Sequence, residues 1–254
     1  MGMKYKSYPT EIWSHIHTSI DKALLQNPRP IAAFDADGTL WDTDLGESFF
    51  QYQIDQKLVE LPPDPWAHYR ELKKKNGDPR SAYLWLAQIL KGQPLERVRD
   101  WASASVTAIQ PVPVFSEQKK LIELFQSRGI QVYIVTASIQ WAVEAGAALV
   151  GLTPKDVIGI RTEIQNGLVT DISEGVITHR EGKAEALLRA TGGQRPFFCS
   201  GNTMGDLELL ECSQDLKLAV SASSQDDKLF KTENELQEEA RRRGWFAHRF
   251  IQSE

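Results

Sequence analysis

The chain has 254 residues, enough for one large domain or for a domain that carries an insertion. Its composition, with 41% hydrophobic and 25% charged residues, is typical of a soluble globular protein. The formal net charge is −5 and no apolar run is long enough to span a membrane, so we expect neither nucleic acid nor a membrane as a partner.

The N-terminal segment and the cysteine content both indicate a reducing compartment. The first residues, MGMKYKSYPTEIW, lack the apolar centre of a signal peptide. Cys199 and Cys212 are the only cysteines, and their spacing is not that of metal ligands. We interpret both as small core residues and expect a cytoplasmic protein.

The chain begins with a predicted helix followed by a predicted strand. Residues 10–25 place three isoleucines on one helical face, which indicates an amphipathic helix. The apolar run 31–34 follows and has the pattern of a buried strand. This strand ends abruptly at Asp35 and Asp37, and Gly38 is expected to begin the turn that leaves it.

The two aspartates have a spacing that suggests phosphate chemistry. Carboxylates at positions i and i+2 of a strand share one face, which opens into the ligand crevice at the end of a parallel strand. Like charges this close repel unless a cation or a proton separates them. Mg²⁺ prefers carboxylate and carbonyl oxygens, and an Asp carboxylate can attack phosphorus. The alternative is an ordinary turn rich in Asp and Gly.

The segment from residue 46 to residue 112 shows no strand pattern. It shows four helical periods instead, at 47–61, 65–74, 80–90 and 94–108, separated by Pro- and Gly-containing breaks. This segment is therefore predicted to be an all-helical insertion between two strands of an α/β core. A β excursion is expected later, over 157–177, with Asn166 and Gly167 as a hairpin turn.

Two further segments carry residues suited to binding an anion. Thr136, Ala137 and Ser138 follow a buried strand and precede a predicted helix, whose N-terminus attracts negative charge. A simple helix cap is the alternative. Lys183 falls in a first helical turn, where the helix dipole disfavours a cation. Neutralisation of a bound phosphate would explain a lysine at this position. The alternative is a solvated surface lysine.

The sequence DADGTLWDTD at 35–44 resembles the first motif, DxDGT, of the haloacid dehalogenase-like (HAD) phosphatases. Three further motifs of that family occur in the family's order. Thr136 matches the Ser or Thr of the second motif, Lys183 the lysine of the third, and Asp206 the second acidic residue of the fourth. Asn202 stands where the fourth motif usually has its first Asp, and this is the main departure from the family pattern.

The resemblance implies a Rossmann-like, doubly wound parallel α/β sheet with an all-helical cap inserted after the first motif. The core domain would comprise residues 1–45 and 112–254, and the cap would comprise residues 46–111. A cap at this position resembles the C1 cap of the phosphoserine phosphatase-like branch. Such a lid can exclude water and contribute substrate contacts.

The resemblance also implies the roles of individual residues. Asp35 would be the nucleophile, and Asp37 would be the general acid and base. The implied catalytic residues are Asp35, Asp37, Thr136 and Lys183. The implied ligands of a Mg²⁺ cofactor are Asp35, Asp37, Asn202 and Asp206. The implied substrate-binding residues are Asp44, Ala137, Gly38 and Thr39.

The expected substrate is a small-molecule phosphate ester. Asp44 corresponds to an acidic residue that binds the substrate amine in phosphoserine phosphatases, whereas the segment 81–90 lacks the arginine that binds a carboxylate there, although Arg80 lies at its edge. Most aromatic residues of the insertion are expected to be core, but two or three in a pocket could hold a quaternary ammonium by cation–π contact. We therefore expect an amine or choline phosphomonoester. The alternatives are phosphoserine phosphatase proper, a phosphotransferase or mutase, and an inactive HAD-fold binding protein.

Overall fold

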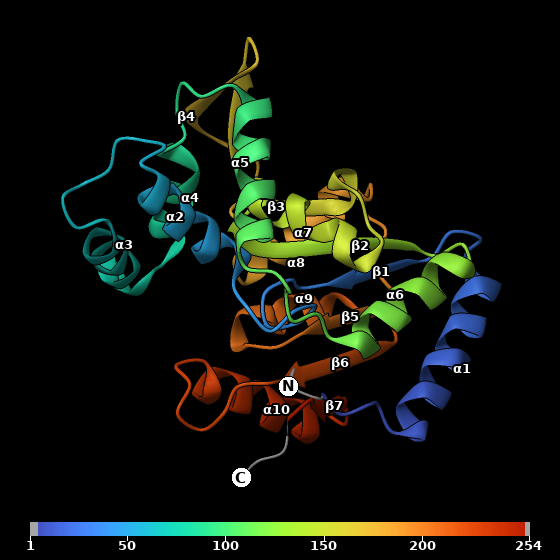
Figure 1. The fold of residues 1–254 in the computed structure, drawn as a ribbon. Helices are drawn as coiled ribbons and strands as arrows, with labels where there is room; N and C mark the ends of the chain where they lie inside the picture. The colour runs from blue at the N-terminus through green and yellow to red at the C-terminus, as the bar shows by residue number, and fades with distance from the viewer. Residues whose placement is uncertain (1–4, 252–254) are drawn as a thin grey trace.

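The computed structural model describes residues 5–251, and Figure 1 shows a central sheet flanked by helices with a separate group of helices at one end. The outermost residues of the predicted core domain, 1–4 and 252–254, lie outside the described residues. The first four residues of the N-terminal segment that lacks the pattern of a signal peptide are among them.

Seven strands of the described chain form one sheet in the order β4-β3-β2-β1-β5-β6-β7. Their bounds are β1 Ile31–Phe34, β2 Gln131–Ile139, β3 Val157–Gln165, β4 Leu168–Glu174, β5 Phe198–Gly201, β6 Leu216–Ser221 and β7 Phe246–Arg249. Strand β1 pairs in parallel with β2 on one side and with β5 on the other. The chain therefore winds outward from β1 in both directions, which is the predicted doubly wound α/β sheet.

The edge strand β4 is the antiparallel exception to this parallel sheet. It forms a hairpin with β3 through Asn166 and Gly167, whose φ angles are 52° and 80°. Two positive φ angles give a turn whose twist matches that of the flanking strands, and Asn-Gly is the dipeptide that adopts them most readily. The predicted hairpin turn is confirmed.

Helices cover both faces of the sheet (Figure 1). Their bounds are α1 Thr10–Gln26, α2 Leu45–Gln56, α3 Pro65–Lys74, α4 Arg80–Gln88, α5 Leu95–Ala108, α6 Ser116–Ser127, α7 Gln140–Ala147, α8 Glu181–Ala190, α9 Leu207–Cys212 and α10 Phe230–Arg242. Helices α1, α6 and α7 pack on one face. Helices α8, α9 and α10 pack on the other.

Strand β1 is buried on both of its faces. Phe34 points into the first helical layer, where its ring centroid lies 6.1 Å from that of Phe125 and 5.1 Å from that of Phe198. Ile31 and Ala33 point into the opposite layer. A continuous apolar run such as 31–34 is what a parallel strand covered on both sides requires. This burial holds Asp35, which follows directly, at the centre of the sheet's carboxyl edge.

Helices α2 to α5 lie between β1 and α6 in the chain and share a core of their own. This core contains Phe49, Phe50, Tyr69, Leu86 and Val98, and it continues into α7 and β4. Helix α2 ends at Gln56 rather than at residue 61, because Lys57 adopts a left-handed backbone conformation (φ 51°) that an α-helix does not continue. The domain boundaries at 46 and 111 stay a prediction.

Within residues 5–251, every helix falls short of the combined length and apolar content that crossing a membrane requires. Helix α1, with 17 residues, is the longest helix within the described residues, and it buries only one face. That face carries the isoleucines of the predicted amphipathic pattern, so the burial of α1 is explained by core packing.

The start of α8 gives a first testable prediction. A Cβ atom at Gly182 would lie 2.0 Å from the carbonyl oxygen of Ile177, so the backbone around the helix start must shift in Gly182→Ala. We expect this substitution to lower the free energy of unfolding by about 1–3 kcal/mol, measured by urea denaturation. Glu185→Ala, on the exposed side of the same helix, should change it by less than about 0.5 kcal/mol. Equal midpoints for the two variants would contradict the close approach.

Candidate active site

The site lies where three adjacent parallel strands end. Asp35 follows β1, Thr136 belongs to the end of β2, and Asn202 follows β5. Strands β2 and β5 are the two neighbours of β1, so their carboxyl ends meet at one place on the sheet edge. A crevice at the point where a doubly wound sheet reverses its strand order is the usual ligand site of such folds.

A buried lysine links two carboxylates at the floor of the site. The Nζ atom of Lys183 lies 2.5 Å from Oδ1 of Asp35 and 2.5 Å from Oδ1 of Asp206. Lys183 is in the first turn of α8, as predicted. Burial and the charge of Asp206 raise the pKa of Asp35 to about 7, although Lys183 acts in the opposite direction. One ammonium therefore does not fully compensate the two carboxylates.

Asp37 is held in a fixed orientation by three hydrogen bonds. Its Oδ1 accepts from the indole N–H of Trp41 at 2.8 Å and from the backbone N–H of Leu45 at 2.9 Å. Its Oδ2 accepts from the hydroxyl of Ser138 at 2.6 Å. Burial raises the pKa of Asp37, while these bonds lower it, and the net direction is upward. Trp41 and Ser138 were not predicted as site residues, although each lies within a few positions of a motif residue.

The region around Thr136 differs from the prediction. The strand continues to Ile139 and its pairing with β3 shifts register between Val135 and Ile139, so α7 begins only at Gln140. The expected helix N-terminus therefore does not lie directly at Thr136. Polar groups of a bulged strand end face the site instead, with the Thr136 hydroxyl accepting from the N–H of Ser138 at 3.1 Å.

Asn202 and Asp206 are both buried and face the same crevice. The Thr39 hydroxyl donates to Oδ2 of Asp35 at 2.9 Å and lies 3.3 Å from Oδ1 of Asn202, so it links these two residues. Oδ2 of Asp206 accepts from the backbone N–H groups of Asn202 and Thr203 at 3.1 and 3.0 Å. Both oxygens of Asp206 therefore already have partners within the protein.

These donors fit a hard cation such as Mg²⁺. No three His, Cys, Asp or Glu side chains within residues 5–251 converge as a metal-binding group, so a cation here needs a mixed set. Asp35, the Asn202 amide oxygen and the Asp37 backbone carbonyl are hard oxygen donors, which Mg²⁺ prefers. One ammonium, on Lys183, faces the two carboxylates of Asp35 and Asp206, so the cluster has room for the positive charge that a divalent cation would supply.

A pocket of about 470 Å³ extends from this floor to the helical insertion. Every predicted site residue except Thr39 lines it: Asp35, Asp37, Gly38, Asp44, Thr136, Ala137, Lys183, Asn202 and Asp206. Thr39 is fully buried behind Asp35. Lining residues that sequence reasoning missed include Lys73, His179, Lys228 and Glu233. None of these four belongs to a motif, so only their place in the fold identifies them.

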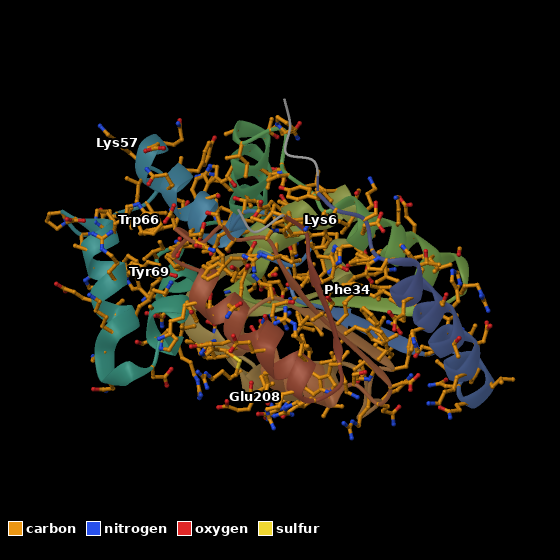
Figure 2. All side chains as sticks on the ribbon, turned by 90° about the horizontal axis from the view of Figure 1, so that it is seen from below. Lys6, Phe34, Lys57, Trp66, Tyr69 and Glu208 are labelled. Carbon is orange, nitrogen blue, oxygen red and sulfur yellow. The ribbon has the colours of Figure 1, made fainter. Side chains whose placement is uncertain are left out.

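Two tyrosines of the insertion line the pocket, and a lysine of the same insertion lies against both. Lys73 Nζ is 4.9 Å from the ring centroid of Tyr69 and 5.5 Å from that of Tyr83. It also forms an ion pair with Glu47 at 3.3 Å. Tyr69 can be found in Figure 2 on the helical insertion, at a distance from Phe34 in the sheet. The other aromatic residues of the insertion belong mainly to its core.

Asp44 also lines the pocket, and it forms no ion pair within the described part of the chain. It caps α2 by accepting from the N–H of Glu47 at 2.7 Å. Burial, and then the charges of Asp37 and Glu47, raise its pKa well above the ordinary value. Lys73 and Lys228 both pair with Glu47 instead. The carboxylate of Asp44 is therefore available to a cation that enters the pocket.

His179 is a neutral polar group in the wall of the pocket. Burial and the charge of Lys183 lower its pKa to about 4. Its ring meets that of Tyr83 edge-on, with 5.4 Å between centroids. The next residue, Arg180, has a φ of 51°, which is strained for a non-glycine residue and turns the chain into α8. An uncharged imidazole here can donate or accept one hydrogen bond without adding charge.

Comparison with known proteins identifies the class to which this fold and site belong. The family of haloacid dehalogenase-like hydrolases matches residues 32–211, which include all four motifs. The chain belongs to this family, and the predicted resemblance is confirmed. The motif residues that the family match covers are the ones that the structure brings to one end of one pocket.

Individual relatives are more distant. Phosphorylcholine phosphatase of Pseudomonas aeruginosa is 24% identical in an alignment of length 195 that covers 62% of this chain and 56% of that relative. The chain thus spans little more than half the length of this curated relative. A conserved protein of unknown function from Anaerococcus prevotii has the same fold, with a TM-score of 0.72, 14% identity and 100% and 99% of the two chains covered.

A phosphoserine phosphatase structure, described as a phospho-aspartyl intermediate analogue, is also similar. Its TM-score is 0.53 at 16% identity, with 89% of this chain and 95% of that chain covered. At this level of identity the likeness concerns the fold. The fold class expected from the sequence, an α/β HAD core with a mostly parallel sheet, is confirmed.

The raised pKa of Asp35 predicts a stability change with pH. Its folded-state pKa of about 7 lies above the ordinary 3.8, so folding binds a proton and stability falls as the pH rises through this window. Asp35→Asn removes this penalty. In a chelating buffer above pH 7 it should raise the free energy of unfolding by on the order of 2–4 kcal/mol, and the gain should shrink toward pH 3.8.

Urea denaturation over a pH series measures this difference. Asp55→Asn, an identical change at an exposed position of α2, is the control and should leave the pH dependence unaltered. A gain from Asp35→Asn that stayed constant over the whole series would contradict the assigned burial of this charge.

Proposed function

We propose that the chain is a Mg²⁺-dependent phosphomonoester hydrolase that acts through an aspartyl-phosphate on Asp35. The observation that carries this proposal is the arrangement at the pocket floor. A nucleophilic carboxylate, a buried lysine and a second, separately held carboxylate on Asp37 all face one cavity. The family is one of hydrolases, which supports the reaction class.

The reaction divides into two displacements. An oxygen of Asp35 attacks phosphorus while the bond to the ester oxygen breaks, and Asp37 gives its proton to the departing alcohol. Water then attacks the acyl phosphate, Asp37 takes a proton from that water, and phosphate leaves with Asp35 regenerated. The raised pKa of Asp37 suits a group that must be protonated in the first step.

Lys183 and Thr136 are proposed to hold the phosphoryl oxygens as charge shifts during each step. Mg²⁺ would be held by Asp35, the carbonyl of Asp37 and Asn202, with Asp206 in or near its coordination sphere, and would neutralise phosphate charge. Uncatalysed hydrolysis of phosphate monoesters is so slow that these groups together must lower the barrier by on the order of 20 kcal/mol. Most of this has to come from fixed charges and positioning, which is why the rigid, buried floor of the pocket matters.

The proposed substrate is an ester of an amine or of choline. Asp44 offers a carboxylate that forms no ion pair within the described residues, and Tyr69 and Tyr83 offer ring faces in the same pocket. Carboxylates outnumber ammonium groups in the lining of the whole pocket, which includes Asp35, Asp37, Asp42, Asp44, Glu47, Asp206, Asp227 and Glu233 against Lys73, Lys183 and Lys228. The similarity to phosphorylcholine phosphatase supports the same substrate class.

The absence of arginine from the described lining argues against a substrate with an α-carboxylate. Arg80, the arginine nearest to the expected position, pairs with Glu181 at 2.6 Å and with Asp78 at 3.5 Å. A panel of phosphoserine, phosphoethanolamine and phosphocholine therefore tests the proposal. Preference for phosphoserine would favour phosphoserine phosphatase proper, and phosphorylated product from an added acceptor alcohol would favour a phosphotransferase.

Residues 46–111 are proposed to act as a cap over this pocket. The insertion supplies Tyr69, Tyr83 and Lys73 to the lining, whereas the core supplies the groups at the floor. Ion pairs join the two parts at the rim, between Arg80 and Glu181 and between Lys228 and Glu47. Contacts of this kind, which are largely solvent-exposed, contribute little stability and allow a lid to open.

The proposed location is the cytoplasm. Both cysteines are buried and unpaired in the structure. Burial raises the pKa of the Cys199 thiol well above its ordinary value, so this residue behaves as an inert core group. Free, unreactive cysteines of this kind suit a reducing compartment.

Replacing the proposed nucleophile tests the reaction. Asp35→Asn should lower kcat for p-nitrophenyl phosphate by at least about a thousandfold, because an amide cannot form the covalent intermediate. Turnover is measured with and without added Mg²⁺. Asp55→Asn, the exposed control, should retain wild-type turnover. Undiminished activity of Asp35→Asn would rule out this mechanism.

Lys73 tests the substrate class. Its ammonium occupies the faces of Tyr69 and Tyr83 that a substrate cation would use, so Lys73→Met should lower KM for phosphocholine by about three- to tenfold. KM for p-nitrophenyl phosphate, whose leaving group carries no cation, should change by less than about twofold. Lys74→Met, at the exposed neighbouring position, is the control. A higher KM for phosphocholine in Lys73→Met would contradict the proposal that Tyr69 and Tyr83 bind the cation of the substrate.

A further inference from the structure

Glu233 is a buried carboxylate that touches the site from outside the motifs. It lies on α10 and is 1% exposed. Its Oε1 accepts from the side-chain Nδ2 of Asn202 at 3.0 Å. Its Oε2 accepts from the backbone N–H groups of Ala222 and Ser223 at 3.1 and 2.9 Å. Glu233 is therefore held by the chain that follows β6 through one oxygen, while its other oxygen contacts the amide of Asn202.

This contact determines which way the Asn202 amide faces. A primary amide carries its NH2 group and its oxygen on opposite sides, and a carboxylate accepts hydrogen bonds only from the NH2 side. The amide oxygen must therefore point away from Glu233, and it lies 3.3 Å from the Thr39 hydroxyl that also binds Asp35. The oxygen, and not the NH2 group, faces the proposed cation position.

Gly38 restricts the same amide from the other side. This residue has a φ of +77°, and a Cβ atom placed on it would lie 2.0 Å from Nδ2 of Asn202. The backbone of the turn after β1 thus packs closely on the NH2 group. Rotation of the amide is opposed by this packing as well as by loss of the bond to Glu233.

We propose that Glu233 is a positioning residue that presents the Asn202 amide oxygen to the cation and increases the negative charge on it. The inference rests on the proposed Mg²⁺ site. A hydrogen bond to an ionised acceptor is stronger than a neutral one and polarises the donor group, so the amide oxygen becomes a better ligand. Asn202 carries no negative charge of its own, unlike the Asp that is usual at this position. Glu233 supplies that charge through its hydrogen bond to the Asn202 amide, and residues that bind a metal ligand in this way tune metal affinity.

The proposal makes the effect of an aspartate at position 202 depend on residue 233. In Asn202→Asp alone, two buried carboxylates would face each other where the 3.0 Å hydrogen bond now lies, and they would repel. In the double variant Asn202→Asp with Glu233→Gln, the acid and the amide exchange places. The hydrogen bond and the total charge are then preserved, with the carboxylate on the cation side.

The experiment is Mg²⁺ titration calorimetry on substrate-free protein at neutral pH. Glu233→Gln should raise the Kd for Mg²⁺ by about ten- to a hundredfold, because the second-sphere charge and the fixed amide orientation are lost. Asn202→Asp should bind no more tightly than wild type, and the double variant should bind within about threefold of wild type or more tightly. Glu235→Gln, on the exposed side of α10, should bind as wild type does.

Thermal melting without Mg²⁺ checks that each variant is folded. If Glu233→Gln fails to fold, the double variant decides, since it retains the hydrogen bond. Two results would overturn the positioning role while leaving the proposed function intact. One is an unchanged Kd in folded Glu233→Gln. The other is a double variant in which the effects of the two substitutions on Kd simply add. A wild-type protein that takes up no Mg²⁺ would overturn both.

Discussion

The buried contact of Lys183 with Asp35 and Asp206 is the interaction on which the rest of the site depends. It joins α8, the end of β1 and the turn before α9, three segments that are far apart in the chain. Removing Lys183 would cost about 3–5 kcal/mol because two buried carboxylates would be left uncompensated. Even intact, the cluster has more carboxylate than ammonium charge, and burial together with the charge of Asp206 raises the pKa of Asp35. A site with this imbalance favours a further cation.

The sheet explains why these groups can be held so rigidly. Strand β1 is the central strand, buried on both faces, with β2 and β5 as its neighbours. Asp35 therefore has close-packed structure on every side except the carboxyl edge. The helical insertion contributes side chains of a different kind, Tyr69, Lys73 and Tyr83, and its core is continuous with that of α7 and β4. A floor fixed by the sheet and a wall of helical side chains suit the proposed reaction, whose chemistry is constant while its leaving group varies.

Local patterns were sufficient for much of the fold. The apolar run before Asp35 gave a correct buried strand because a strand covered on both faces needs no polar alternation. Asn166 and Gly167 identified the hairpin because few other residues adopt two positive φ angles. The end of α2 and the length of β2 were predicted wrongly. The first depends on a left-handed lysine and the second on a bulged pairing with β3, and neither has a local signal.

The order of short motifs, each next to a strand end or helix start, determined the family and the residues that meet at the pocket floor. The tertiary structure alone decided how those residues are held. Ser138 orients Asp37 from 101 positions away, and Glu233 orients Asn202 from 31 positions away. It also decided that Lys73, rather than open space, lies against the two pocket tyrosines. Hydrogen-bond and ring contacts of this kind require distances of a few ångströms between distant segments, and sequence patterns carry only the spacing along one segment.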